Sequence, residues 1–310
     1  MTIPRLSARD MMPVALRGGI AALGNFDGFH QGHQAVAGEA ILQAKAAGKP
    51  AIIATFDPHP VRYFAPGATP FRLTTLDQRQ RLFEAAGADA MLVFEFDSEL
   101  AGTTAENFIG KLLVERLCLS GVVTGEDFTF GKGRGGSIKV LKEVGTANGL
   151  SSTAVGPVTD TDGVISSSRV REALQSGDCA TANRLLTRPF AIEGIVQHGD
   201  KNGRLLGYPT ANIDIGNYLR PRYGVYAVTG RLSDGRVLKG AANIGIRPQF
   251  TPPKELLEPH FFDFAEDIYD QNLEVAFYHF LRGEAKFDSL GALKEQMAAD
   301  CAKARDLLGE

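Results

Sequence analysis

Two histidines, His30 and His33, lie three residues apart with a glycine between them. An apolar run at 20–23 precedes them and an alanine-rich stretch at 34–48 follows, which predicts a strand, a glycine-rich turn and a helix. Such a turn points backbone N–H groups and a helix N-terminus at one place, where a phosphate binds well. Two imidazoles there can donate hydrogen bonds to phosphate oxygens as charge develops during displacement. The H-x-G-H pattern therefore indicates nucleotidyl transfer, in which the α-phosphate of a nucleoside triphosphate is attacked and pyrophosphate leaves.

Simpler interpretations of this pair are ordinary capping or surface histidines. A zinc site is the other alternative, but zinc needs four ligands and no nearby cysteine or acidic residue has the required spacing. The flanking Gly24, Phe26 and Asp27 and the preceding strand favour the functional interpretation.

Two loops that follow predicted strands carry further candidate groups. The segment 57–60, D-P-H-P, follows the apolar run 51–56. Its His59, with Phe56 and Tyr63 on either side of the segment, could flank a flat ring or a phosphate. The segment 125–136 combines acids, aromatics, cations and glycines, and a loop of this kind in a compact domain is usually functional. Asp127 and Phe128 in it suit an isoalloxazine or purine ring. The alternatives are a proline-terminated strand and a mobile surface loop.

A third segment, I-S-S-S-R-V-R at 165–171, predicts the start of a helix. Ser166 and Ser167 can cap that helix, whereas Arg169 and Arg171 invert the charge that helix starts normally favour. A bound polyphosphate explains these cations better than capping alone.

The elements that must position these groups alternate between strands and helices. Apolar runs predict strands at 51–56, 90–94, 121–124 and 151–155, and periodic segments predict helices at 77–87, 104–117 and 138–148. Such alternation indicates a doubly wound parallel sheet, an α/β fold of the Rossmann-like nucleotidyltransferase type. Ligands bind such sheets at the carboxyl ends of strands, so the histidine turn and the 125–127 segment should face one crevice.

The pattern changes near Arg188-Pro189. Strands are predicted at 190–197, 224–232, 237–244 and 272–281, with a hairpin turn at 233–235 and a final helix at 289–308. This order indicates an antiparallel β-barrel or sandwich with a closing helix. We expect a boundary within 184–189, giving one domain at 1–186 and a second at 187–310.

The second half carries its own candidate groups. Thr210 and Asn212 lie two apart on an extended segment, so they point to one side, and their oxygens suit Mg²⁺. Glu258 lies among aromatics and could act as a general base, although a surface acid is the simpler interpretation. Arg282 and Glu284 are expected to form a surface ion pair.

Composition limits the classes of function. The 310 residues carry a net charge of −3, which gives no support to nucleic-acid binding through phosphate neutralisation. No apolar stretch is long enough to span a membrane and no signal peptide is evident. Three separated cysteines suggest no disulfide framework. We therefore expect a cytoplasmic protein, monomeric or weakly homo-oligomeric, that binds small molecules, with no nucleic-acid or membrane partner.

Taken together, the motifs resemble those of the bifunctional bacterial riboflavin kinase/FMN adenylyltransferases, also called FAD synthetases. The resemblance runs from about residue 15 to 308. It rests on G-N-F-D-G-F-H-Q-G-H at 24–33, T-F-D-P-H-P at 55–60, G-E-D-F-T-F-G at 125–131, I-S-S-S-R-V-R at 165–171, G-R-L-L-G-Y-P-T-A-N at 203–212, N-I-G-I-R-P at 243–248 and L-R-G-E-A-K-F at 281–287.

The resemblance implies two activities that use ATP. The C-terminal domain would phosphorylate riboflavin to FMN, and the N-terminal domain would join FMN to a second ATP, giving FAD and pyrophosphate. In the adenylyltransferase it implies His30 and His33 as catalytic residues. It further implies ATP contacts from Gly24, Phe26, Asp27, Ser166, Ser167 and Arg169, and flavin contacts from Phe56, His59, Asp127 and Phe128.

In the kinase domain the resemblance implies that Glu258 takes the hydroxyl proton and that Arg247 binds the flavin. Mg²⁺ and ATP would be held by Gly203, Gly207, Pro209, Thr210 and Asn212, with Thr210 and Asn212 on the metal.

Three positions depart from the family pattern. Gln249 stands where a threonine often follows R-P, Pro259 follows the expected base and removes a ladder donor, and Asp270 replaces a glycine. Aspartate tolerates the left-handed conformation better than most residues.

Three rival functions remain at this point. One is a nucleotidyltransferase whose barrel only binds or regulates, and another is a relative of tRNA-charging enzymes, which share H-x-G-H. The third is a flavin-storage protein without catalysis.

Overall fold

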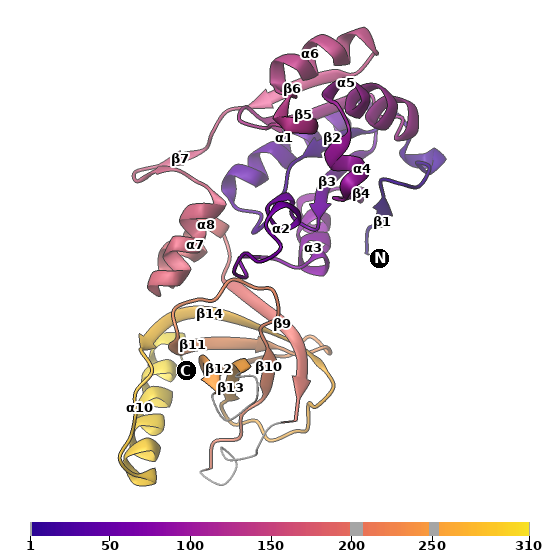
Figure 1. The fold of residues 1–310 in the computed structure, drawn as a ribbon. Coiled ribbons are helices and arrows are strands. Elements are labelled where there is room, and N and C mark those ends of the chain that lie inside the picture. The colour runs from indigo at the N-terminus through magenta and orange to yellow at the C-terminus, as the bar shows by residue number, and fades with distance from the viewer. Residues whose placement is uncertain (1, 199–206, 248–253, 310) are drawn as a thin grey trace. The chain divides into compact units, whose positions relative to one another are not determined.

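The computed structural model describes residues 2–198, 207–247 and 254–309, whose elements are labelled in Figure 1. The chain forms two compact units. The first unit comprises Met1–Thr69 and Thr75–Ser166, and the second comprises Pro70–Thr74 and Ser167–Glu310. Among the described residues, no helix is long and apolar enough to cross a lipid bilayer.

The first unit is built on a six-stranded parallel sheet (Figure 1). Its strands lie in the order β1-β4-β3-β2-β5-β6. They are β1 (Arg5–Ser7), β2 (Ile20–Leu23), β3 (Ala51–Asp57), β4 (Ala90–Glu95), β5 (Gly121–Gly125) and β6 (Ser151–Val155). The order runs outward in opposite directions from the neighbouring strands β2 and β5, so the topological switch point lies between them. The predicted doubly wound parallel sheet is confirmed.

Helices connect these strands. They are α1 (Gln31–Ala47), α2 (Pro60–Phe64), α3 (Leu76–Ala86), α4 (Ser98–Gly102), α5 (Ala105–Asn107) and α6 (Ile138–Ala147), with a small hairpin formed by β7 (Thr159–Asp160) and β8 (Gly163–Val164). A π-helix at Phe108–Arg116 continues α5. The helix predicted at 104–117 is therefore present, but most of it is a π-helix and not an α-helix.

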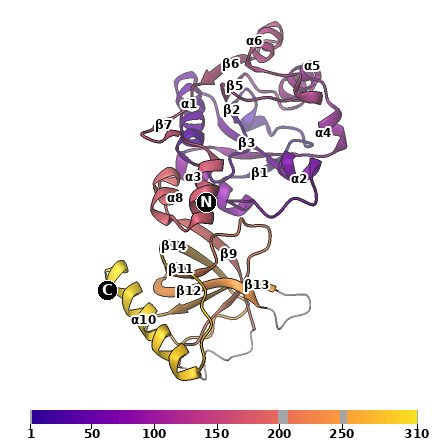
Figure 2. The same cartoon turned by 60° about the vertical axis from the view of Figure 1, so that its left-hand side comes forward.

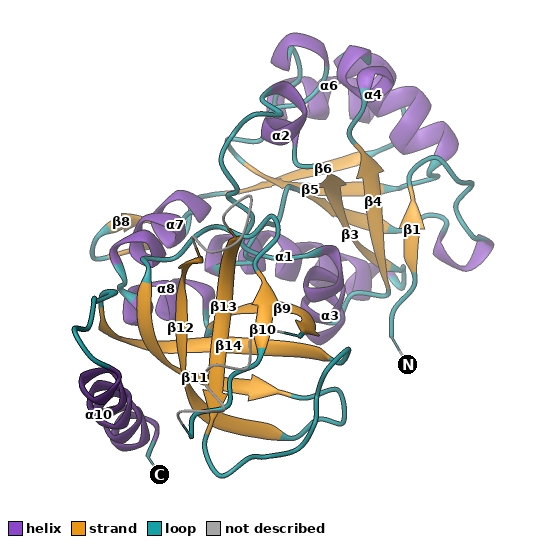
Figure 3. Cartoon of the chain, turned by 60° about the horizontal axis from the view of Figure 1, so that its bottom comes forward, coloured by secondary structure: helices purple, strands orange, loops and turns teal. Residues whose placement is uncertain are grey.

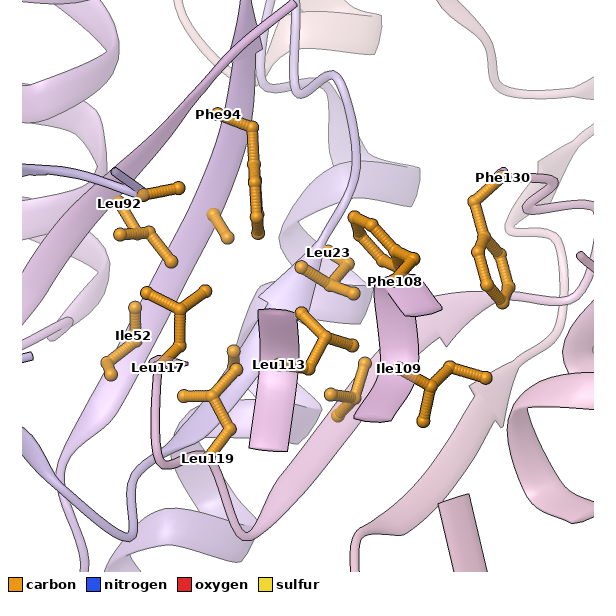
Figure 4. Close-up of a cluster of buried hydrophobic side chains, with 14 of the residues drawn as sticks. Leu23, Ile52, Leu92, Phe94, Phe108, Ile109, Leu113, Leu117, Leu119 and Phe130 are labelled. Atoms are coloured by element: carbon orange, nitrogen blue, oxygen red, sulfur yellow. The ribbon is translucent and has the colours of Figure 1, made fainter. Parts of the chain in front are cut away.

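Both faces of the sheet are buried, which explains the continuous apolar runs of its strands. One face packs under α5, α6 and the π-helix, where Leu23, Ile52, Phe94 and Phe108 meet (Figure 4). The other face packs under α1 and α3 around Phe83. Successive residues of β2 alternate between the two clusters, as the period of two in a strand requires.

The second unit is a closed antiparallel barrel with helices around it (Figure 3). Its strands lie in the order β10-β13-β12-β11-β14-β9. They are β9 (Phe190–Gln197), β10 (Asn212–Asp214), β11 (Gly224–Arg231), β12 (Val237–Arg247), β13 (Lys254–Phe261) and β14 (Asn272–Arg282). The predicted antiparallel barrel is confirmed, and the predicted hairpin turn joins β11 to β12.

Three helices accompany the barrel. The helices α7 (Ser167–Ser176) and α8 (Cys179–Leu186) precede it, and α10 (Leu290–Leu308) runs beside the strands (Figure 2). The side chain of Asn183 in α8 ties that helix to the strands, because it donates to the carbonyl oxygen of Phe277 at 2.8 Å and accepts from the backbone N–H of Phe190 at 2.8 Å.

Two of the departures from the family pattern fall on described residues. Asp270 has φ of +60°, the left-handed conformation expected of it. Pro259 lies within β13, paired with Ala242, and its carbonyl oxygen accepts from the backbone N–H of Ala211 at 2.9 Å. Gln249 lies outside the described residues.

Candidate active sites

The turn between β2 and α1 has a constrained backbone. Phe26 and Phe29 have φ of +48° and +45°, which aromatic residues rarely adopt, and Gly28 between them has φ of +87°. The ring of Phe26 is only 1% exposed and packs edge-on against His33 at 5.2 Å. Residues held in sparsely populated conformations persist where the surroundings determine them and concentrate at functional sites.

His30 and His33 lie together at the N-terminus of α1. Their rings are stacked, with centroids 3.7 Å apart and planes 22° from parallel. His30 is the N-cap, and its Nδ1 accepts from the backbone N–H of His33 at 3.4 Å. The helix therefore begins at Gln31, earlier than predicted. When the His30 imidazole is neutral, this contact places its proton on Nε2.

Gly32 fits tightly between the histidine turn and a second segment. A Cβ on Gly32 would lie 3.1 Å from Cε1 and 3.2 Å from Nδ1 of His30, and 3.3 Å from the carbonyl oxygen of Ile165. The residue before Ser166 is thus in contact with the histidine turn. Ser166 is the last residue of the first unit, whereas Ser167 and Arg169 lie at the start of α7 in the second unit.

Arg171 on the same helix has a structural partner. Its Nε donates to the carbonyl oxygen of Phe71 at 2.9 Å, and its guanidinium lies 5.3 Å from the Phe71 ring centroid. Of the two cations that suggested a polyphosphate, Arg171 therefore also holds a neighbouring segment in place.

The predicted flavin-binding residues of the first unit lie at or just after the carboxyl ends of β3 and β5, the two strands that flank β2. His59 is the N-cap of α2 and accepts from the N–H of Val61 at 3.2 Å. Asp127 is exposed and Phe128 half-buried, both just after β5. Phe56 is buried near the end of β3 and stacks on Phe94 with centroids 5.2 Å apart.

A continuous chain of aromatic contacts links Phe56 to Phe128. From Phe94 it passes to Phe108 at 5.6 Å, then to Phe130 at 5.2 Å, which stacks on Phe128 at 5.7 Å. Phe94, Phe108 and Phe130 are drawn in Figure 4. The structure thereby connects the two loops that the sequence indicated for a flat ring.

The second unit contains a pocket of about 380 Å³. Thr210, Arg247 and Glu258 line it, as do residues for which sequence analysis assigned no role in a site: Tyr208, Asn243, His260, Glu284, Asp300 and Cys301. Asn243 lies directly opposite Glu258 on the neighbouring strand. The pairing of these two strands and the shared pocket identify Asn243 as a neighbour of Glu258, and neither can be read from a single sequence.

Glu258 forms an ion pair inside this pocket. Nη2 of Arg247 donates to Oε2 of Glu258, and both side chains are largely buried. Burial lowers the pKa of Arg247, opposed by the nearby charge of Glu284.

The expected ion pair of Arg282 with Glu284 is wrong. Arg282 instead pairs with Asp300 of α10, with Nε 3.0 Å from each carboxylate oxygen and Nη2 2.8 Å from Oδ2. Gln296 adds a further hydrogen bond to Asp300 at 2.9 Å. Asp300 is only 6% exposed, so its charge is neutralised within the fold. Arg282 and Glu284 both line the barrel pocket, but the partner of Arg282 comes from α10, which sequence spacing did not reveal.

The expected nucleotide loop is partly described. Gly203 lies outside the described residues. Gly207 has φ of +87°, and the carbonyl oxygen of Pro209 contacts Nδ1 of His260 at 2.8 Å. Thr210 lines the pocket, whereas Asn212 opens β10 and is not among the described residues that line it.

Thr210 gives the barrel pocket a hydroxyl oxygen, a donor of the type that magnesium accepts. Among the described residues, no group of three or more His, Cys, Asp or Glu side chains is placed to hold a metal ion. Magnesium that arrives with a nucleotide takes its ligands mainly from phosphates and water and needs few from the protein. The Thr210 hydroxyl in the pocket fits that requirement.

Comparison with known proteins addresses both units. The sequence model of the FAD synthetase family matches residues 13–169, and that of the riboflavin kinase family matches residues 186–308. The bifunctional riboflavin kinase/FMN adenylyltransferase of Escherichia coli K12 is 38% identical over 292 residues, which cover 94% of this chain and 93% of the relative. The chain belongs to the bifunctional riboflavin kinase/FMN adenylyltransferase family.

Further relatives agree. Family members from Pseudomonas fluorescens and Bacillus subtilis are 40% and 37% identical, each over at least 90% of both chains. A crystal structure described as a macrolide-efflux protein from Streptococcus pneumoniae superposes with a TM-score of 0.85 at 29% identity, covering 96% of this chain and 97% of that one. The two-part architecture of the family is therefore present over nearly the whole chain.

Proposed function

We propose that the histidine turn of the first unit is the site at which FMN is adenylylated. The chain, as a member of its family, is a bifunctional transferase of FAD biosynthesis: a riboflavin kinase and an FMN adenylyltransferase that uses ATP, riboflavin and FMN and makes FAD. The observation that carries the assignment of the site is the stacked pair His30 and His33 at a helix N-terminus, beside the switch point of a parallel sheet.

In the proposed reaction an oxygen of the FMN phosphate attacks the α-phosphorus of ATP. The bond from that phosphorus to the bridging oxygen breaks, and pyrophosphate leaves. His30, with its proton on Nε2, and His33 donate hydrogen bonds to the α-phosphate oxygens as negative charge builds there. No covalent intermediate with the protein is required, so positioning and charge stabilisation account for the rate.

The substrates are proposed to lie around this pair. Gly24 and Asp27, with the backbone of the enclosed Phe26, would face ATP, and Ser166, Ser167 and Arg169 would hold its phosphates. The flavin ring would lie between the loops that carry Phe56, His59, Asp127 and Phe128. The contact of Ile165 with Gly32 supports this arrangement for the segment that leads to Ser166.

We propose that the barrel pocket is the riboflavin kinase site. The ribityl 5′-hydroxyl would give its proton to Glu258 and attack the γ-phosphorus of ATP, whose bond to the β,γ-bridging oxygen breaks to release ADP. Since Arg247 occupies Oε2 of Glu258, the hydroxyl would use Oε1, and Arg247 would contact the flavin. Gly203, Gly207 and Pro209 would form the ATP loop.

Thr210 and Asn212 would hold Mg²⁺ in this site. The ion, when bound, neutralises the charge of the ATP phosphates. The protein's own contribution is a fixed base opposite Asn243 and a half-buried hydroxyl in one pocket.

The functional boundary is proposed at 186/187, between α8 and β9. We further propose that the enzyme works in the cytoplasm, where ATP is made and where its free cysteines stay reduced. It would act as a monomer or weak homo-oligomer without nucleic-acid or membrane partners. Sedimentation at micromolar concentration, with and without RNA or vesicles, tests these points.

Separate substitutions test the two sites. His30→Ala should stop FAD formation from added FMN and leave FMN formation from riboflavin intact. Glu258→Gln keeps the shape of the side chain, and it should stop FMN formation while FAD still forms from added FMN. FMN formation from riboflavin is the internal control for His30→Ala, and FAD formation from added FMN is the internal control for Glu258→Gln. Loss of both activities in a folded variant would contradict independent sites.

A further inference from the structure

Arg79 is a buried cation with no role in the proposed mechanism. It lies on α3 in the first unit and is only 3% exposed. A buried guanidinium persists only where its donors find partners. The partners of Arg79 show what it holds in place.

Three of these partners are polar groups near the carboxyl edge of the sheet. Nη1 of Arg79 donates to Oγ1 of Thr55 at 2.6 Å and to the carbonyl oxygen of Asn25 at 3.2 Å. Nη2 lies 3.8 Å from the Asp57 carboxylate. The same guanidinium therefore connects α3 with β3 and with the turn that carries the histidines.

The carbonyl of Asn25 receives a second hydrogen bond. Thr55, fully buried on β3, donates to it at 2.7 Å. Two donors thus fix the plane of the peptide that joins Asn25 to Phe26. Phe26 is the first residue of the turn with positive φ, and its ring packs edge-on against His33. Fixing that carbonyl fixes the entrance to the turn and the ring that supports the histidine.

We propose that Arg79 is a positioning residue for adenylyl transfer, acting with Thr55 through the Asn25 carbonyl to hold the histidine turn in its reactive arrangement. This inference rests on the proposed site at His30 and His33. Arg79 itself is enclosed, with only 3% of it exposed.

Positioning predicts a kinetic signature that differs from that of simple destabilisation. A small displacement of the histidines weakens contacts to the transition state more than contacts to the bound substrates. Arg79→Met, which removes every donor but keeps an apolar stem, should lower kcat for FAD formation by about tenfold to a hundredfold. The KM values for FMN and ATP should change by less than about threefold, since the ground state is little affected.

The full-length protein provides the controls. Riboflavin phosphorylation in the second unit should be unchanged in Arg79→Met. Arg81→Met makes the same substitution at an exposed position of the same helix and should leave both activities unchanged. Arg79→Lys should recover part of the lost kcat, because one ammonium can reach some but not all of the partners.

A double-mutant cycle tests the shared carbonyl. Thr55→Val removes the second donor to the Asn25 carbonyl at nearly constant volume. If Arg79→Met does not fold, Thr55→Val alone tests whether the Asn25 carbonyl positions the histidine turn. If both residues act through Asn25, the double variant should lose less kcat than the product of the two single losses. Multiplicative losses would show that the two residues act independently and would overturn the shared route.

The outcomes separate this inference from the proposed site. A folded Arg79→Met protein with normal kcat, beside an inactive His30→Ala, would overturn the positioning role alone. Normal FAD formation by His30→Ala would overturn the site itself. A fall in kcat matched by an equal fall in the folded fraction would assign Arg79 a structural role and contradict the proposal.

Discussion

Two glycines in α1 allow a sharp test of the histidine turn. Gly32 faces the His30 ring, where an added Cβ would be 3.1–3.2 Å from ring atoms, whereas a Cβ on the exposed Gly38 meets nothing within 4 Å. Both have ordinary helical backbone, so Gly→Ala is favourable for the helix at either position, by roughly 0.5–1 kcal/mol in its interior and less near its end. The two substitutions thus separate helix stability from the placement of the ring.

The expected loss follows from the size of the clash. Contacts of 3.1–3.3 Å require the neighbour to move by a few tenths of an ångström. Displacement of a catalytic group by 1 Å costs about a hundredfold in rate, so this shift corresponds to roughly three- to tenfold. Gly32→Ala should therefore lower kcat for FAD formation by about that factor.

The assay follows FAD formed from added FMN and ATP by chromatography, with riboflavin phosphorylation measured on the same preparation. Gly38→Ala should keep both activities and gain stability. The reasoning is refuted if Gly32→Ala retains full FAD formation, because the position of the His30 ring would then be unimportant. It also fails if Gly38→Ala loses as much activity as Gly32→Ala.

Two further predictions concern the barrel pocket. Asp300→Asn leaves the largely buried Arg282 without its counter-ion. Because that guanidinium keeps some solvent contact, the free energy of unfolding should fall by about 2–3 kcal/mol, below the usual range for breaking a buried pair. Calorimetry should show the barrel transition shifted down by roughly 5–10 °C, and an unchanged transition would contradict the pairing. Burial raises the pKa of the Cys301 thiol to about 11, so its alkylation by iodoacetamide should be slow at pH 7 and accelerate steadily toward pH 11. Mass spectrometry of the modified peptide measures that profile, and a rate that levels off near pH 8 would contradict it.

Much of the first unit could be predicted because its signals are local. The run at 51–56 is apolar except for Thr55, since β3 is buried on both faces. The turn with His30 and His33 carries its glycines and histidines in one short segment. Its helix starts earlier than predicted because the His30 side chain caps it, an interaction that composition does not show.

Other features depended on contacts between distant segments. The strand β13 was not predicted as a regular strand, because Glu258 and Pro259 interrupt its pattern and its pairing with β12 is what defines it. The partner of Arg282 lies on another element, 18 residues away. Arg79 lies in a sequence that is typical of the exposed side of a helix. Tertiary packing nevertheless buries it, and its side chain connects α3 with β3 and with the histidine turn.

The position of the pocket wall along the chain has a consequence for biosynthesis. Leu293, Met297, Asp300 and Cys301, all on α10, form one side of the barrel pocket, so this side is made from residues that the ribosome adds after every barrel strand. The histidine turn, by contrast, lies far upstream of α10 in the chain, and domains synthesised first generally fold first. A chain that stops shortly before α10 would therefore emerge with a complete adenylyltransferase sheet and an open, unfinished kinase pocket. Termination of translation shortly before α10 should thus convert a two-step enzyme into one that depends on FMN made elsewhere.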